Sequence, residues 1–184
     1  MDQNHRMRRF ELLILPHLDA AYRFARWLTS TESDARDLLQ EACLRALQYF
    51  DSFRGVNGRA WLLTVVRNTC YRQYHASAAD ANFVEFDEST HGPEDVSPMA
   101  NIAVPVTPQD ALECEQDRIS LRRAIAILPN DYRETLILRE MEGLSYQEIA
   151  DVFNIPVGTV MSRLARAREL LMRNVRAQQQ REAQ

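Results

Sequence analysis

Apolar residues recur at intervals of three and four along most of this 184-residue chain, and no segment alternates polar and apolar residues for long enough to form a sheet. In residues 34–50, the apolar positions fall on one stripe of a helix: Leu38, Leu39, Ala42, Cys43, Ala46 and Leu47. Helices of this kind bury their stripes by packing against one another. The sequence therefore predicts an all-α fold.

Two helical units are separated by a segment in which this periodicity disappears. Residues 76–108 contain four prolines, and ten acidic residues but no arginine or lysine lie between Ala76 and Asp117. A segment of this composition cannot bury enough apolar surface to order itself, so we expect a flexible acidic linker. The expected architecture is thus two small helical domains, at residues 10–75 and 109–176, joined by a linker at 76–108.

The first domain is expected to contain three helical segments, at about 10–28 with a kink at Pro16, at 34–50 and at 59–74. The second is expected to contain four helices, at about 109–127, 130–141, 145–153 and 157–175.

The charge distribution matters more than the net charge of −4. Outside the acidic stretch the chain carries 22 positive and 16 negative charges, a net +6, and every basic residue is an arginine. Arginine presents a planar fork that suits phosphates and guanine edges, although genome composition could equally explain the preference.

A cytoplasmic location without membrane insertion is expected. No apolar run approaches the roughly 20 residues needed to span a bilayer, and the N-terminal segment does not form a convincing signal peptide. The three cysteines, Cys43, Cys70 and Cys114, are far apart and odd in number, which suits a reducing compartment.

The stretch from Gly143 to Leu171 predicts two helices joined by a very short turn. Ser145 and Glu148 form a capping box at the start of the first helix. Asn154 suits the left-handed end of that helix, and Pro156 separates the two helices. A turn this short favours a steep crossing, as in DNA-binding helix-turn-helix units.

The second of these helices has an outward face that suits a major groove. From Val157 onward there are six arginines and two glutamates, and the first acid is Glu169. A groove-binding helix needs small residues and a few donors on a face without acids. The alternative is a solvated surface helix, which would normally mix charges of both signs, so the pattern favours DNA binding.

The longer segment "LPNDYRETLILREMEGLSYQEIADVFNIPVGTVMSRLARAREL" resembles region four, the promoter-binding domain of extracytoplasmic-function (ECF) sigma factors of bacterial RNA polymerase. Upstream, "DARDLLQEACLRAL" resembles the region two helix that binds core polymerase, and "GRAWLLTVVRN" resembles the segment that opens and reads the −10 element. The resemblance covers both helical units in the order expected for the family.

The resemblance implies three sets of binding residues. Those for the −35 element are Ser162 and Arg166 with apolar contact from Met161 and Ala165, and Thr159, Arg163 and Arg168 on phosphates. Those for the −10 strand are Arg59, Trp61, Arg67 and Asn68. Those for core polymerase are Asp34, Asp37, Gln40 and Glu41.

Two of these assignments have alternatives in the sequence itself. The acids of residues 34–41 could favour a helix N-terminus through its dipole, which explains Asp34 and Asp37 well but Glu41 poorly. Trp61 could stack on an unpaired base or lie in the core. Arg72 stands where many family members carry an acid, and the basic run that commonly follows is missing.

The implied partners are promoter DNA, the clamp helices of the largest catalytic polymerase subunit, the flap region of the second-largest subunit, and an anti-sigma factor. As a sigma factor the protein would have no catalysis or cofactor of its own and would join the nucleoid within the holoenzyme. A helix-turn-helix regulator that binds duplex DNA alone is the nearest alternative. An anti-sigma-like helical module, or a metal site using Cys70 and His75, fits the sequence less well.

Overall fold

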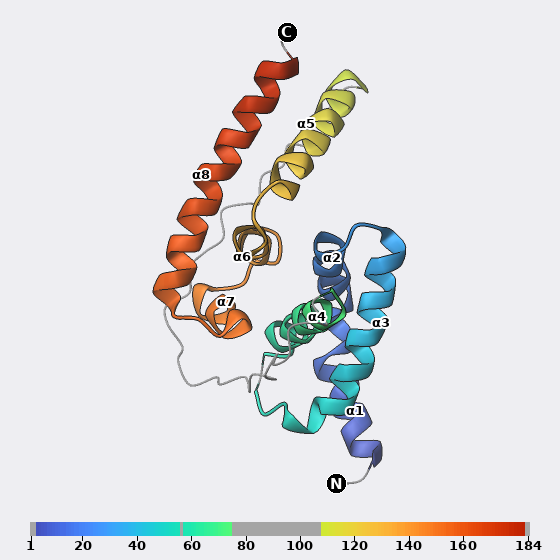
Figure 1. Cartoon of the computed structure of the whole chain (residues 1–184). Coiled ribbons are helices and arrows are strands. Elements are labelled where there is room, and N and C mark those ends of the chain that lie inside the picture. The colour runs from blue at the N-terminus through green and yellow to red at the C-terminus, as the bar shows by residue number, and fades with distance from the viewer. Residues whose placement is uncertain (1–2, 56, 75–107, 183–184) are drawn as a thin grey trace. The chain divides into compact units, whose positions relative to one another are not determined.

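The computed structural model describes residues 3–55, 57–74 and 108–182, and every regular element within these ranges is helical (Figure 1). This confirms the predicted all-α fold. Most of the predicted linker, residues 76–107, lies outside the described residues. The elements are α1 (Gln3–Leu13), η1 (Leu15–His17), α2 (Leu18–Leu28), α3 (Glu32–Tyr49), η2 (Phe50–Ser52), α4 (Gly58–Tyr74), α5 (Pro108–Ala126), α6 (Asn130–Glu140), α7 (Tyr146–Phe153) and α8 (Val157–Glu182).

These helices belong to two compact units. The first contains α1 to α4 together with Gln147–Pro156, which holds most of α7. The second contains α5, α6 and α8. Each unit is described separately below.

The first helical segment is interrupted where the sequence predicts. Pro16 lies in the 3₁₀ turn η1, between α1 and α2, because proline has no amide to donate and its ring obstructs a continuing α-helix. The chain becomes helical earlier than expected, at Gln3 rather than near residue 10. The first turns of α1 are polar and carry no apolar stripe, so periodicity does not reveal them.

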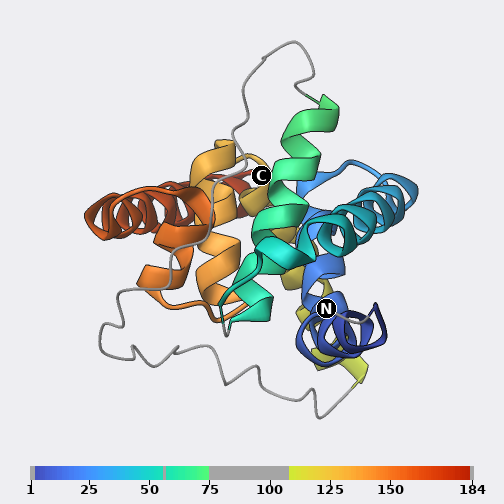
Figure 2. The same cartoon turned by 90° about the horizontal axis from the view of Figure 1, so that it is seen from below.

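The core of the first unit lies where α2, α3 and α4 pack together (Figure 2). Helix α3 begins after Thr31, whose Oγ1 accepts the amide of Asp34 at 3.1 Å as an N-cap. Its fully buried stripe is Ala35, Leu38, Ala42 and Ala46. Three of these four residues are alanines, so the partner helices can approach α3 closely.

Helix α4 is buried on nearly all sides along its first half. Every residue from Ala60 to Val66 is buried. The hydroxyl of Thr64 donates to the carbonyl of Ala60 at 2.9 Å, so this polar group is satisfied within the core. A helix that is apolar all round belongs in an interior, and α4 accordingly packs against both α2 and α3.

The second unit is organised along α8, which packs against α5 and α6 (Figure 1). Its predicted apolar stripe is largely confirmed, because Val160, Leu164 and Ala167 are buried and Leu171 is half-buried. Helix α8 extends to Glu182, seven residues beyond the predicted end. Contacts with α5 accompany this extension, since the Ser120 hydroxyl donates to Gln178 Oε1 at 2.8 Å.

The turn that follows α7 has the predicted backbone. Asn154 has a φ of 51°, in the left-handed region, and the amide of Ile155 donates to the carbonyl of Ala150 at 3.0 Å. Helix α7 begins at Tyr146, directly after Ser145, and α8 begins directly after Pro156. Only Asn154, Ile155 and Pro156 therefore connect the two helices.

Candidate promoter and polymerase interfaces

The first turns of α8 present a continuous solvent-facing surface. Gly158, Met161, Ser162, Ala165 and Arg166 are all exposed, while the buried stripe occupies the opposite side. Ser162 donates its hydroxyl to the carbonyl of Thr159 at 3.0 Å. The structure thus brings together the residues predicted to read bases, with small side chains around one long donor.

Each of the arginines predicted to bind the −35 element has an acidic neighbour. Arg166 Nη1 lies 2.7 Å from Glu169 Oε2, within α8 itself. Arg163 Nη2 lies 2.9 Å from Asp131 Oδ2 on α6. An exposed pair such as Arg166–Glu169 contributes only about 0–1 kcal/mol, so phosphates or bases can compete for Arg166 at low cost.

Arg168 is held more firmly. Its Nη2 and Nε lie 2.6 and 3.2 Å from Glu140 Oε1, and the Glu140 side chain is only 15% exposed. The hydrogen bond to Glu140 is the main cause that raises the pKa of Arg168 above its usual value. The guanidinium of Arg168 therefore stays protonated. Arg168 therefore ties α8 to α6 in addition to any contact with DNA. The sequence does not reveal this pair, because its members are 28 residues apart.

The predicted polymerase-binding residues lie along one side of α3. Asp37 and Gln40 are exposed, and Asp34 and Glu41 are half-buried. The carboxylate of Glu41 also accepts a hydrogen bond from Arg45 Nε at 2.8 Å. Leu44, one turn further on, is 58% exposed. One exposed apolar side chain thus lies beside the acidic side of α3.

Trp61 packs in the core of the first unit. Its side chain is 3% exposed, and its ring centroid lies 5.1 Å from that of Phe53 and 6.3 Å from that of Phe50. A ring enclosed in this way has no free face for a base. Of the two roles left open by the sequence, the core role is the one observed.

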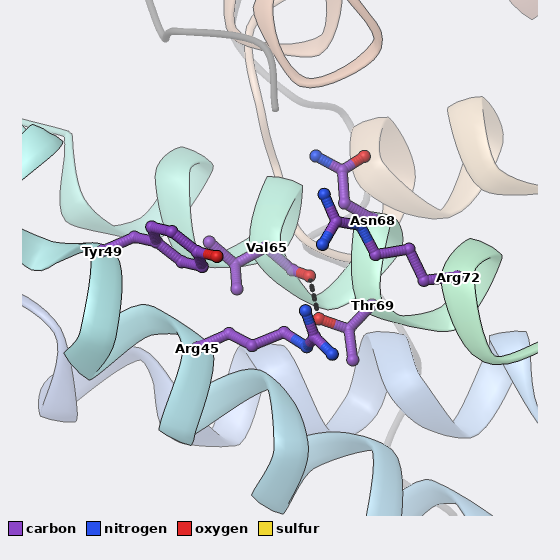
Figure 3. A pocket seen from close by; sticks show the side chains of 6 residues that line it. All are labelled: Arg45, Tyr49, Val65, Asn68, Thr69 and Arg72. Carbon is purple, nitrogen blue, oxygen red and sulfur yellow. Dashed lines mark hydrogen bonds between the residues drawn. The ribbon is translucent and has the colours of Figure 1, made fainter. Parts of the chain in front are cut away.

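The other predicted −10 residues are only partly exposed. Arg59, Arg67 and Asn68 are half-buried on α4, and the Arg67 guanidinium lies 4.6 Å from the ring centroid of Tyr71. Asn68 lines a small pocket between α3 and α4 (Figure 3), whose other lining residues are Arg45, Tyr49, Val65, Thr69 and Arg72. Two arginines from different helices therefore lie at the same pocket as Asn68, a cluster that sequence spacing alone could not show.

His17, in η1, is sensitive to pH. Burial, and secondarily the positive charge of Arg59, lower the pKa of His17 below its ordinary value. Between the unfolded and folded pKa values the unfolded chain binds more protons, so stability falls as pH drops below about 6.5. On going from pH 7.5 to 5, the melting temperature of the wild type should fall further than that of a His17→Gln variant. Equal decreases in the two proteins, measured by circular dichroism, would contradict this assignment.

Two negative findings apply to the described part of the chain. Within residues 3–55, 57–74 and 108–182, no group of three or more His, Cys, Asp or Glu side chains is placed to hold a metal ion. Burial raises the pKa of the Cys43 thiol, and Cys70 is buried. In those same ranges, no helix combines the length and apolarity that crossing a membrane requires.

Comparison with known proteins agrees with this arrangement. The Sigma-70 region 2 family matches residues 13–79, and the Sigma-70, region 4 family matches residues 118–171. The RNA polymerase sigma-H factor of Pseudomonas aeruginosa is 33% identical over 172 residues, which cover 89% of this chain and 84% of that protein. The ECF RNA polymerase sigma-E factor of Escherichia coli is 36% identical over 146 residues, covering 75% of this chain and 72% of that protein.

Solved structures show the same fold. The sigma factor RpoE of Bartonella quintana, crystallised with the anti-sigma factor NepR, aligns with a TM-score of 0.64 and 28% identity over 91% of this chain and 97% of that chain. CnrH, in complex with the cytosolic domain of CnrY, aligns with a TM-score of 0.61 over 93% of this chain. The match of the first unit to Sigma-70 region 2 favours a sigma factor over a simple helix-turn-helix regulator, which would not contain this region. The chain is an RNA polymerase sigma factor of the ECF type, a DNA-binding initiation factor that directs promoter-specific transcription.

Proposed function

We propose that the two halves of the chain divide promoter recognition between them. Residues 10–75 bind core polymerase and open the −10 element, residues 109–176 read the −35 element as duplex, and residues 76–108 form a flexible linker. The observation that supports this most directly is the exposed, acid-free surface at the start of α8, from Gly158 to Arg166. The acidic side of α3 supports the polymerase-binding role.

At the −35 element, Ser162 and Arg166 contact base edges, and Met161 and Ala165 supply apolar contact. Thr159, Arg163 and Arg168 contact phosphates. The half-buried Thr159 and Arg163 flank the exposed surface, as residues that grip the backbone on either side of a groove would. Arg168 has a second role in this proposal, because it also anchors α8 to α6 through Glu140.

At the −10 element, Arg59, Arg67 and Asn68 hold the unpaired strand. Their partial exposure on a helix whose other sides are buried gives the strand a rigid platform. Trp61, on the same helix, anchors α4 in the core and does not touch DNA in the proposal.

For core polymerase, Asp34, Asp37, Gln40 and Glu41 meet the clamp helices of the largest subunit, and the second unit meets the flap region of the second-largest subunit. An Asp37→Arg variant should bind core polymerase at least about tenfold more weakly, because an acid that faces a basic partner becomes a like charge. Fluorescence anisotropy with labelled protein and purified core enzyme would measure the change.

Glu11→Arg is the matched control for this variant. Glu11 is an exposed acid of the same unit, on α1, and lies outside the proposed surface. Its reversal should leave core affinity within about twofold of the wild type. An equal loss in both variants would mean that net charge alone matters and that α3 is not the docking surface.

The remaining proposals follow from family membership. The protein has no catalytic activity of its own, is cytoplasmic, and joins the nucleoid as part of the holoenzyme. An anti-sigma factor regulates it, as the partners of the Bartonella RpoE structure suggest. The decisive experiment is transcription in vitro with core polymerase on a promoter library. Specific transcripts that depend on this protein would support the proposal, whereas duplex binding without transcription would refute it.

A further inference from the structure

Helix α1 lies almost entirely outside the matched sigma region, which begins at residue 13, yet it contacts the end of α3. Arg6 Nη2 donates to the carbonyl of Leu47 at 2.6 Å, and Arg6 Nε lies 2.9 Å from Asp51 Oδ1. The last four carbonyls of a helix have no partner within it, and a cation there also interacts favourably with the helix dipole. Arg6 therefore caps the C-terminus of α3 from a distant part of the chain.

Arg9 extends these contacts into the segment between α3 and α4. Its Nη2 donates to the carbonyl of Phe53 at 3.4 Å, and its guanidinium carbon lies 5.5 Å from the ring centroid of Phe50. Phe10 adds an edge-to-face contact with Phe50, at 5.2 Å between centroids. Phe53 in turn packs on Trp61 of α4. Helix α1 thus contacts Phe50 and Phe53, which precede α4 in the chain.

The start of α4 also rests on the end of α1. A Cβ atom at Gly58 would lie 2.0 Å from the carbonyl oxygen of Leu13 and 3.0 Å from its carbonyl carbon. These are backbone atoms that cannot rotate away, so only glycine allows this approach. Arg59, one of the proposed −10 residues, follows immediately. The start of α4 therefore lies directly against the backbone of α1 at Leu13.

We propose that α1 is a positioning element for −10 recognition. Its Arg6 and Arg9 contact the end of α3 and the residues Phe50 and Phe53, and its Leu13 lies against Gly58 at the start of α4. This inference rests on the proposed reading of the −10 strand by α4. Helix α1 touches no DNA in this arrangement. It keeps Arg59, Arg67 and Asn68 in the geometry that the unpaired strand requires, so that binding does not have to order the segment first.

The test compares Arg6→Ala with Arg8→Ala. Both arginines are on α1, but Arg8 is exposed and Arg6 makes the contacts described above. The probe is a fork-junction DNA, with its −10 non-template strand unpaired, taken from a promoter that the wild-type holoenzyme transcribes. Holoenzyme containing Arg6→Ala should bind this DNA roughly five- to tenfold more weakly, and Arg8→Ala should stay within about twofold of the wild type.

Two further measurements separate positioning from general destabilisation. Affinity for core polymerase and for a −35 duplex should stay within about twofold in Arg6→Ala. Arg6→Lys, which keeps the charge but not the forked geometry, should restore part of the fork-junction affinity. Equal affinities of the Arg6→Ala and Arg8→Ala holoenzymes would overturn the inference. A parallel loss of core, −35 and fork-junction binding would also overturn it.

Variants of α4 itself distinguish failure of this inference from failure of the proposed −10 function of α4. Asn68→Ala should weaken fork-junction binding whatever α1 does. If Asn68→Ala weakens binding and Arg6→Ala does not, α4 reads the strand and α1 does not position it. If neither Asn68→Ala nor Arg67→Ala has an effect, the −10 role of α4 is wrong, and the role of α1 is wrong with it.

Discussion

Replacing Trp61 with alanine should lower the free energy of unfolding of the first unit by about 3–5 kcal/mol, the range typical of large aromatic side chains removed from a core. Trp61 is 3% exposed and contacts the rings of both Phe50 and Phe53, so its removal leaves a cavity among residues that are themselves buried. Urea unfolding followed by circular dichroism would measure the loss. Trp27, the other tryptophan, is half-buried on α2. Its replacement by alanine should lower the free energy of unfolding by less.

Trp61→Phe separates the core role from base stacking. Phenylalanine retains much of the buried ring and should lose far less stability than alanine does. If Trp61 acts only through the core, promoter opening by the Trp61→Phe holoenzyme should stay near the wild-type level wherever the unit remains folded. Permanganate reactivity of unpaired thymines would report the opening. A Trp61→Phe protein with wild-type stability but little opening would show that the indole meets DNA after all.

The helices could be predicted from the sequence because their signals are local. Pro16 in η1 and Asn154 after α7 each specify one boundary within a few residues. Trp61 could not be assigned in the same way. A tryptophan in an apolar helix fits both a core and a stacking platform, and only the positions of Phe50 and Phe53 decide between them.

Contacts between distant segments explain what the sequence did not reveal. Glu140 and Arg168 are 28 residues apart, and Arg6 and Leu47 are 41 residues apart. No spacing rule links such positions, because they meet only when the helices pack. The polar start of α1 cannot be predicted for the same reason, because Arg6 makes its contacts with distant residues and the segment has no apolar stripe.

Arg166→Ala should lose about 1–3 kcal/mol of discrimination at one or two base pairs of the −35 element, while its affinity for other sequences changes little. Arg166 is exposed among small side chains, and its pair with Glu169 is on the surface, so DNA can recruit it at low cost. Binding of the variant to a library of −35 duplexes, measured at a fixed salt concentration, would show a relaxed preference at those positions only.

Arg168→Ala provides the contrast that makes this result interpretable. Arg168 would contact a phosphate and also hold Glu140, so its loss should weaken all promoters about equally and lower the melting temperature of the second unit. Arg122→Ala, which removes an exposed arginine from α5, controls for the loss of one positive charge. Should Arg166→Ala and Arg168→Ala both reduce affinity uniformly across the library, the exposed surface of α8 would only grip the backbone, and the bases would be read elsewhere.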